Sequence, residues 1–96
     1  MIVLHVTYHC KPGMRENFYR QIVLEGLDAA SRAEEGNLQY DYYVPVNGTD
    51  ELLLIEKWKD YEALAVHGRR PHFARIGELK AAYVLETAVE RLTELP

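Results

Sequence analysis

The sequence lacks the features that mark several large classes of protein. No apolar run approaches the roughly 20 residues that a membrane-spanning helix requires, and no long Lys/Arg run favours binding to nucleic acid or anionic lipid. Cys10 is the only cysteine, so an internal disulfide cannot form. The start, Met-Ile-Val-Leu, has no basic region of the kind that begins a signal peptide. We therefore expect a cytoplasmic protein that binds neither a membrane nor nucleic acid.

What is present fits one globular domain over residues 1–96. The chain is 48% hydrophobic and 27% charged, with a formal net charge of −4. A domain of this size buries only about 60–65% of the surface that its unfolded chain exposes, so a deep pocket is hard to build from one copy. Aromatic and imidazole side chains are plentiful: seven Tyr, one Trp and four His.

The spacing of apolar residues predicts the order β-α-β-β-α-(α)-β. The predicted elements are a strand over 2–9, a helix from 14 to about 33, strands over 38–44 and 51–58, a short helix over 61–67, a helix from 71 and a strand over about 85–92. Asn47-Gly48 predicts a hairpin turn. Asp60 is placed to cap the short helix, and Pro71 to begin the next one. Gly26, inside the first helix, suggests close packing there.

This order is typical of the ferredoxin-like split βαβ fold, an α+β class in which helices cover one face of a four-stranded antiparallel sheet. The first strand carries Ile2 and Val6 on one face and Val3 and Thr7 on the other. Neither face is plainly a water-facing one, so we expect a second copy of the chain to cover the face that the helices leave bare. The predicted partner is therefore another copy, in a homodimer.

Several short motifs together resemble the antibiotic biosynthesis monooxygenase (ABM) domain family, from Met1 to about Thr93. They are Lys11-Pro12-Gly13, Glu34-Glu35-Gly36-Asn37-Leu38, Glu56-Lys57-Trp58, Asp60-Tyr-Glu-Ala-Leu64, His67 and Pro71-His72-Phe73. The resemblance implies a dimeric α+β barrel with a pocket between sheet and helices in each unit. The family includes quinol monooxygenases and an isomerase of the phosphorylated autoinducer-2 signal. Haem chemistry, known in a related branch, is not expected, because Ala74–Leu79 lacks the histidine that ligates the iron there.

His67 and His72 are the sharpest candidates for catalysis. A helix dipole favours imidazolium at the C-terminal end of a helix, where His67 is predicted, and the neutral ring at the N-terminal end, where His72 is predicted. One site could therefore obtain both an acid and a base. The alternative is that both rings pack the corner between two helices, bonded to backbone carbonyls.

Glu56 and Trp58 share a face of the predicted third strand. A carboxylate beside a buried Trp needs a partner or a raised pKa, which makes Glu56 a candidate base or an anchor for a histidine. Tyr40 and Tyr42 share a face of the second strand and could line a pocket for a flat aromatic or polar ketone. Tyr42 and Trp58 could donate to a developing oxyanion. The alternatives are a core Trp, a solvated Glu56, and tyrosines that fill the sheet or the dimer interface.

The remaining polar residues yield weaker predictions. Arg70, with Arg69, flanks Pro71 and could meet an anionic substrate, although a solvated loop is the simpler interpretation. Phe73, in the Pro71-His72-Phe73 motif, is a candidate substrate contact. His5 and His9 would lie about 13 Å apart on a strand, so no metal site is expected. Cys10 lacks the surroundings of a nucleophile.

Three functions remain open. The leading hypothesis is a monooxygenase without metal, flavin or haem, in which a pocket base deprotonates a phenol or hydroquinone and the anion reacts with dioxygen. The second is an isomerase of a small phosphorylated ketone, for which only Arg69, Arg70 and Arg32 could supply cations. The third is a non-catalytic dimeric barrel that binds a small ligand or serves in a stress response.

Overall fold

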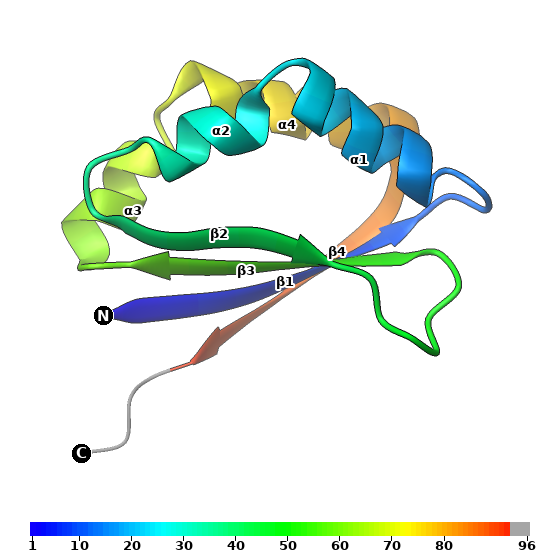
Figure 1. The fold of residues 1–96 in the computed structure, drawn as a ribbon, viewed down its shortest axis with the longest axis horizontal. Helices are drawn as coiled ribbons and strands as arrows, with labels where there is room; N and C mark the ends of the chain where they lie inside the picture. Colours follow the sequence, from blue (N-terminus) through cyan, green and yellow to red (C-terminus); the bar gives the residue numbers. More distant parts are fainter. Residues whose placement is uncertain (93–96) are drawn as a thin grey trace.

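A four-stranded antiparallel sheet with the strand order β2-β3-β1-β4 organises residues 1–92, the part of the chain that the computed structural model describes (Figure 1). The elements follow in the order β1 (Ile2–Cys10), α1 (Arg15–Leu24), α2 (Leu27–Arg32), β2 (Asn37–Tyr43), β3 (Glu51–Trp58), α3 (Tyr61–His67), α4 (Pro71–Tyr83) and β4 (Val84–Leu92). The predicted α+β, ferredoxin-like arrangement is confirmed. The end of the predicted domain, residues 93–96, lies outside the described residues.

Alternation along the strands gives the sheet one buried face. Along β3, from Glu51 to Trp58, residues are alternately half-buried and buried. On β1, Val6 and Tyr8 are buried and each pairs with a buried residue of β3. Successive side chains on a strand point to opposite faces. The buried set faces the helical layer, where Phe18 and Ile22 of α1 are fully enclosed. Figure 1 shows α1, α2 and α4 over this face and no helix over the other.

The helix predicted from Met14 to about Ala33 is in fact two helices. α1 ends at Leu24 and α2 begins at Leu27, because Gly26 between them has a φ of +69°, in the left-handed region that glycine adopts without strain. The expectation that Gly26 serves close packing is wrong, since a Cβ built there meets nothing within 4 Å. None of the helices within residues 1–92 is both long enough and apolar enough to span a membrane.

Two connections meet at one end of the sheet. The carbonyl of Gly36, before β2, accepts a 2.8 Å hydrogen bond from the backbone N–H of Lys59, after β3. Asp60 caps α3 as predicted, its carboxylate accepting from the backbone N–H of Ala63 at 2.9 Å. These contacts bring the turn that carries Glu34 beside α3.

Candidate active site

Two helix ends place two imidazoles beside one carboxylate. α3 ends at His67, and α4 begins at Pro71, as predicted from the sequence. His72 therefore lies in the first turn of α4, with its ring centroid 5.7 Å from that of His67. Glu34, in the turn that follows α2, reaches both rings.

A single oxygen of Glu34 binds both rings. Its Oε2 lies 2.5 Å from Nδ1 of His67 and 2.8 Å from Nε2 of His72. Although burial raises the pKa of Glu34, the hydrogen bonds from His72 and His67 outweigh burial and hold that pKa below its usual value. An ionised carboxylate can only accept, so both ring nitrogens donate. In the neutral rings, the lone pairs are then on Nε2 of His67 and Nδ1 of His72.

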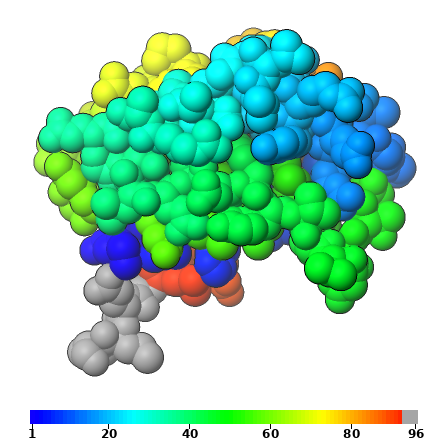
Figure 2. All heavy atoms as spheres, viewed as in Figure 1, coloured from blue at the N-terminus to red at the C-terminus, as the bar shows by residue number. Residues whose placement is uncertain are grey.

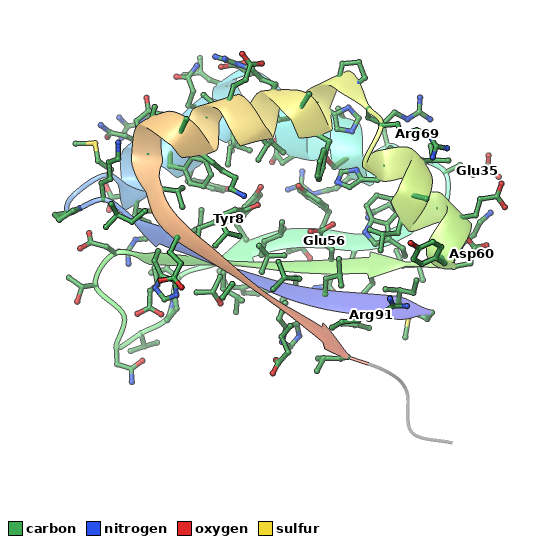
Figure 3. The ribbon with its side chains drawn as sticks, turned by 180° about the vertical axis from the view of Figure 1, so that it is seen from behind. Tyr8, Glu35, Glu56, Asp60, Arg69 and Arg91 are labelled. Atoms are coloured by element: carbon green, nitrogen blue, oxygen red, sulfur yellow. The ribbon has the colours of Figure 1, made fainter. Side chains whose placement is uncertain are left out.

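A second carboxylate, Glu56, lies on the other side of His67. Its Oε1 is 3.9 Å from Nε2 of His67 and accepts a 3.1 Å hydrogen bond from the indole N–H of Trp58. Burial raises the pKa of Glu56 against the opposing hydrogen bond from Trp58. In Figure 3, Glu56 points from the sheet toward the helical layer. Two carboxylates whose pKa values shift in opposite directions thus flank one imidazole, an arrangement that can supply an acid and a base.

Aromatic rings enclose His67 within the core. The ring centroids of Trp58, Phe73 and Tyr40 lie 4.6, 5.3 and 5.8 Å from that of His67. Trp58 and Tyr40, which were predicted to bind substrate, are almost fully buried and therefore shape the site from beneath. The indole N–H of Trp58 already binds a carboxylate, so it is not available to a substrate oxyanion in this structure. The buried hydroxyl of Tyr42 has no hydrogen-bond partner within residues 1–92.

The solvent-facing side of the cluster consists of His72, Phe73 and Arg70. The His72 side chain is 14% exposed, whereas those of His67 and Glu34 are 2% and 5% exposed. Phe73 and Arg70 are both about half exposed. The guanidinium Nε of Arg70 lies 3.6 Å from Oε1 of Glu34, an oxygen that is buried and accepts no hydrogen bond in the described part of the chain. Of the three hydrogen-bonded residues, His72 is therefore the one most open to a substrate.

Glu34 is a site residue that the sequence pattern does not predict. Glu34-Glu35-Gly36-Asn37 is typical of a helix stop, and in the structure this motif follows the end of α2. The register places the start of β2 beside Trp58, since Asn37 pairs with Trp58. A carboxylate just before that strand therefore lies at the end of the sheet where α3 begins, and this spatial argument could have identified Glu34.

Glu34, His67 and His72 are the group within residues 1–92 whose composition resembles a metal site, with ligand atoms within 4.8 Å of one another. Two ligands of one zinc-like ion, each about 2.0–2.2 Å from the metal, lie about 3 Å apart or more. In this structure the 2.5 Å contact between Glu34 and His67 is a short hydrogen bond between a ring nitrogen and a carboxylate oxygen. We therefore describe the cluster as a hydrogen-bonded acid–base network.

Comparisons with known proteins point to one family. The family model described as "Antibiotic biosynthesis monooxygenase" matches residues 1–79. "Putative monooxygenase YcnE" from Bacillus subtilis is 41% identical over 73 residues, covering 76% of this chain and 75% of YcnE. "Putative monooxygenase Rv0793" from Mycobacterium tuberculosis is 34% identical over 76 residues, covering 75% and 74%. The crystal structure of PA3566 from Pseudomonas aeruginosa superposes with a TM-score of 0.87 at 33% identity, covering 99% of this chain and 94% of PA3566.

Proposed function

The chain belongs to the antibiotic biosynthesis monooxygenase family, and we propose that it oxidises a small hydroquinone-type substrate with dioxygen, without metal, flavin or haem. One observation carries the proposal: Glu34 accepts from Nε2 of His72 and so leaves Nδ1 of this partly exposed ring able to take a proton. A carboxylate orients the basic histidine of a catalytic triad in the same way.

The reaction needs no reductant, because the substrate supplies all the electrons. Nδ1 of His72 removes a proton from a substrate hydroxyl, which makes the ring electron-rich, and a ring carbon then forms a C–O bond with dioxygen. The imidazolium returns its proton to the peroxide oxygen. Loss of water, which breaks the O–O bond, leaves a new carbonyl, so that a hydroquinone and dioxygen become a hydroxyquinone and water.

The surrounding residues support each proton transfer. Buried Glu34 stabilises the imidazolium that forms on His72, because its negative charge lies 2.8 Å from the ring nitrogen in a site with little water. His67 lies between Glu34, to which it is hydrogen-bonded, and Glu56, whose raised pKa suits it to hold a proton. Phe73 offers a half-exposed ring against which a flat substrate can pack.

The proposal is tested by oxygen uptake with a panel of hydroquinones and anthrones. We expect one dioxygen consumed per substrate, with one atom of labelled dioxygen in the product and the other in water. His72→Gln should lower kcat by about 100- to 10,000-fold, the range for loss of a general base. His9→Gln, on β1 and outside the cluster, is the matched control and should retain full activity.

Two other outcomes would reject the proposal in favour of the alternatives. Conversion of a phosphorylated ketone without oxygen uptake would favour the isomerase. The isomerase would need cations to bind the phosphate of its substrate. One of the candidates, Arg32, is already engaged, because the Arg32 guanidinium binds Asp28 and the Tyr40 carbonyl. Tight binding of one compound with no conversion of any would favour the non-catalytic barrel.

A further inference from the structure

A hollow lies at the opposite end of the sheet from the acid–base cluster. It has a volume of about 600 Å³ and opens between α1 and the C-terminal end of β2. The register separates the two sites, since Tyr43 at the end of β2 pairs with Leu53, whereas Asn37 at its start pairs with Trp58. Residues that line the hollow include Arg15, Tyr19, Arg20, Val23, Tyr42 and Val44. In Figure 2, this edge shows α1 in blue above the green connection that follows β2.

The walls of the hollow are apolar and partly open to solvent. Tyr19, Val23 and Val44, which all line the hollow, are 41%, 45% and 53% exposed. The rings of Tyr19 and Tyr42 meet edge to face with centroids 5.5 Å apart. A hollow of 300–1,000 Å³ lined by aromatic and aliphatic side chains has the size and character of a small-molecule site. A cluster of exposed apolar side chains on a protein surface is itself an indication of a binding site.

The charge at the rim is positive, in contrast to the net charge of the chain. Two guanidinium groups, Arg15 and Arg20, and one carboxylate, Glu16, border the hollow, while the whole chain carries −4. Arg15 donates to the carbonyls of Gly48 and Glu51 at 3.4 Å and so ties α1 to the connection between β2 and β3. Arg20 forms no ion pair within residues 1–92.

We propose that this hollow binds a small organic anion with a flat apolar body, of the aromatic carboxylate or sulfonate class. The body packs between Tyr19, Tyr42 and Val23, and the anionic group meets Arg20, whose guanidinium can hold two oxygens at once. This site goes beyond the proposed oxygenation and does not depend on it, because it shares no residue with the acid–base cluster.

The test uses 1-anilinonaphthalene-8-sulfonate, a fluorescent aromatic sulfonate, and the neutral N-phenyl-1-naphthylamine on the full chain. We expect one sulfonate bound per chain. Arg20→Gln should raise its Kd about tenfold, the effect of losing a charge-assisted hydrogen bond. Arg69→Gln, an exposed arginine outside the hollow, is the matched control and should leave the Kd unchanged. The neutral probe should bind equally well to the chain and to Arg20→Gln, and the sulfonate should displace it.

Two results would overturn the inference. One is an unchanged Kd for the sulfonate in Arg20→Gln, or the same change in Arg69→Gln. The other is a lower molecular mass of Arg20→Gln in sedimentation, which would mean that a second copy of the chain occupies the hollow. Arg20 is exposed, so its replacement should not prevent folding. Val23→Glu, which places a negative charge among the apolar walls, should abolish binding of the sulfonate and checks the site independently of Arg20.

Discussion

At the scale of single residues, Glu34 is the group on which the acid–base cluster depends. Its carboxylate accepts from two rings that belong to two different helices, and only 5% of its side chain is exposed. A buried charge that loses its partners is strongly destabilising. Conversely, rings left without this carboxylate would lose the hydrogen bonds that fix which nitrogen carries the proton. Stability and catalysis therefore both respond to this one side chain.

We expect Glu34→Gln to lower the free energy of unfolding at pH 7 by about 2–3 kcal/mol, the value of hydrogen bonds to a charged group. The pKa of Glu34 lies below its usual value of 4.5 in the folded protein, because the bonds from His72 and His67 outweigh burial. Its stabilisation is thus present above about pH 4.5 and is lost as the pH falls through the lowered pKa. The difference in free energy of unfolding between Glu34→Gln and the unaltered protein should therefore become smaller in acid. Urea unfolding at several pH values, followed by Trp58 fluorescence, measures it.

Glu62→Gln is the matched control for this measurement. Glu62 is an exposed glutamate in the first turn of α3, and its replacement should change stability by less than about 0.5 kcal/mol. The free energies of unfolding of Glu34→Gln and of the unaltered protein could instead differ by the same amount from pH 7 to acid. That result would contradict the proposed ionisation of Glu34.

The residues of the site could be predicted where chain geometry alone decides their place. Strand alternation put Glu56 and Trp58 on one face, and helix capping put His67 and His72 at facing helix ends. Glu34 could not be found that way, because its role depends on a turn whose direction is determined by packing against α3. The same holds for Tyr40. Strand alternation predicts which face of the sheet its side chain lies on, but not that its ring meets the ring of His67.

At the scale of elements, the turn between α2 and β2 determines where Glu34 lies. Gly36 has a φ of +88°, and a Cβ built there would lie 2.7 Å from the Cβ of Ala63 in α3. Both the backbone conformation and the close approach of α3 therefore require glycine. Gly13 provides a contrast, since its φ of +75° is similar but a Cβ there meets nothing within 4 Å.

We expect Gly36→Ala to destabilise the protein by about 2–4 kcal/mol, from left-handed strain together with overpacking. Gly13→Ala carries the strain alone and should cost about 1–2 kcal/mol. Because α3 must shift to admit the methyl group, Gly36→Ala should also lower the activity on hydroquinones, whereas Gly13→Ala should not. Urea unfolding and oxygen uptake on both variants measure these effects. Equal losses of stability in the two variants would show that α3 does not press on Gly36.

Element boundaries were less predictable than element types. The apolar stripe from Met14 to Ala33 is continuous, so periodicity predicts one helix. Glycine costs only about 1 kcal/mol inside a helix, and this local cost does not show that the chain will turn there. In the structure Gly26 adopts a left-handed conformation, and α2 therefore leaves the line of α1.

At the scale of the whole molecule, the sheet has helices on one face and none on the other (Figure 1). On the bare face, Thr7 lies between Leu53 and Ala88, and His5 lies between Ile55 and Glu90. On β4, the same face carries Leu92, which pairs with Val3 and is 36% exposed. An antiparallel sheet can face water on one side when that side is polar. This one is mixed, which is why the homodimer predicted from β1 remains our expectation.

We therefore expect sedimentation equilibrium to give twice the 11.1 kDa of one chain. Ile55→Lys should convert the dimer to a monomer, because it places a charge at the centre of the bare face and a desolvated, unpaired charge opposes association. The monomer should remain folded, since Ile55 is only half-buried in the single chain and a lysine there can reach water. Leu24→Lys, on exposed α1, is the matched control and should leave the mass unchanged. A monomer for the unaltered chain, or dissociation caused by Leu24→Lys instead of Ile55→Lys, would rule out the bare face as the interface.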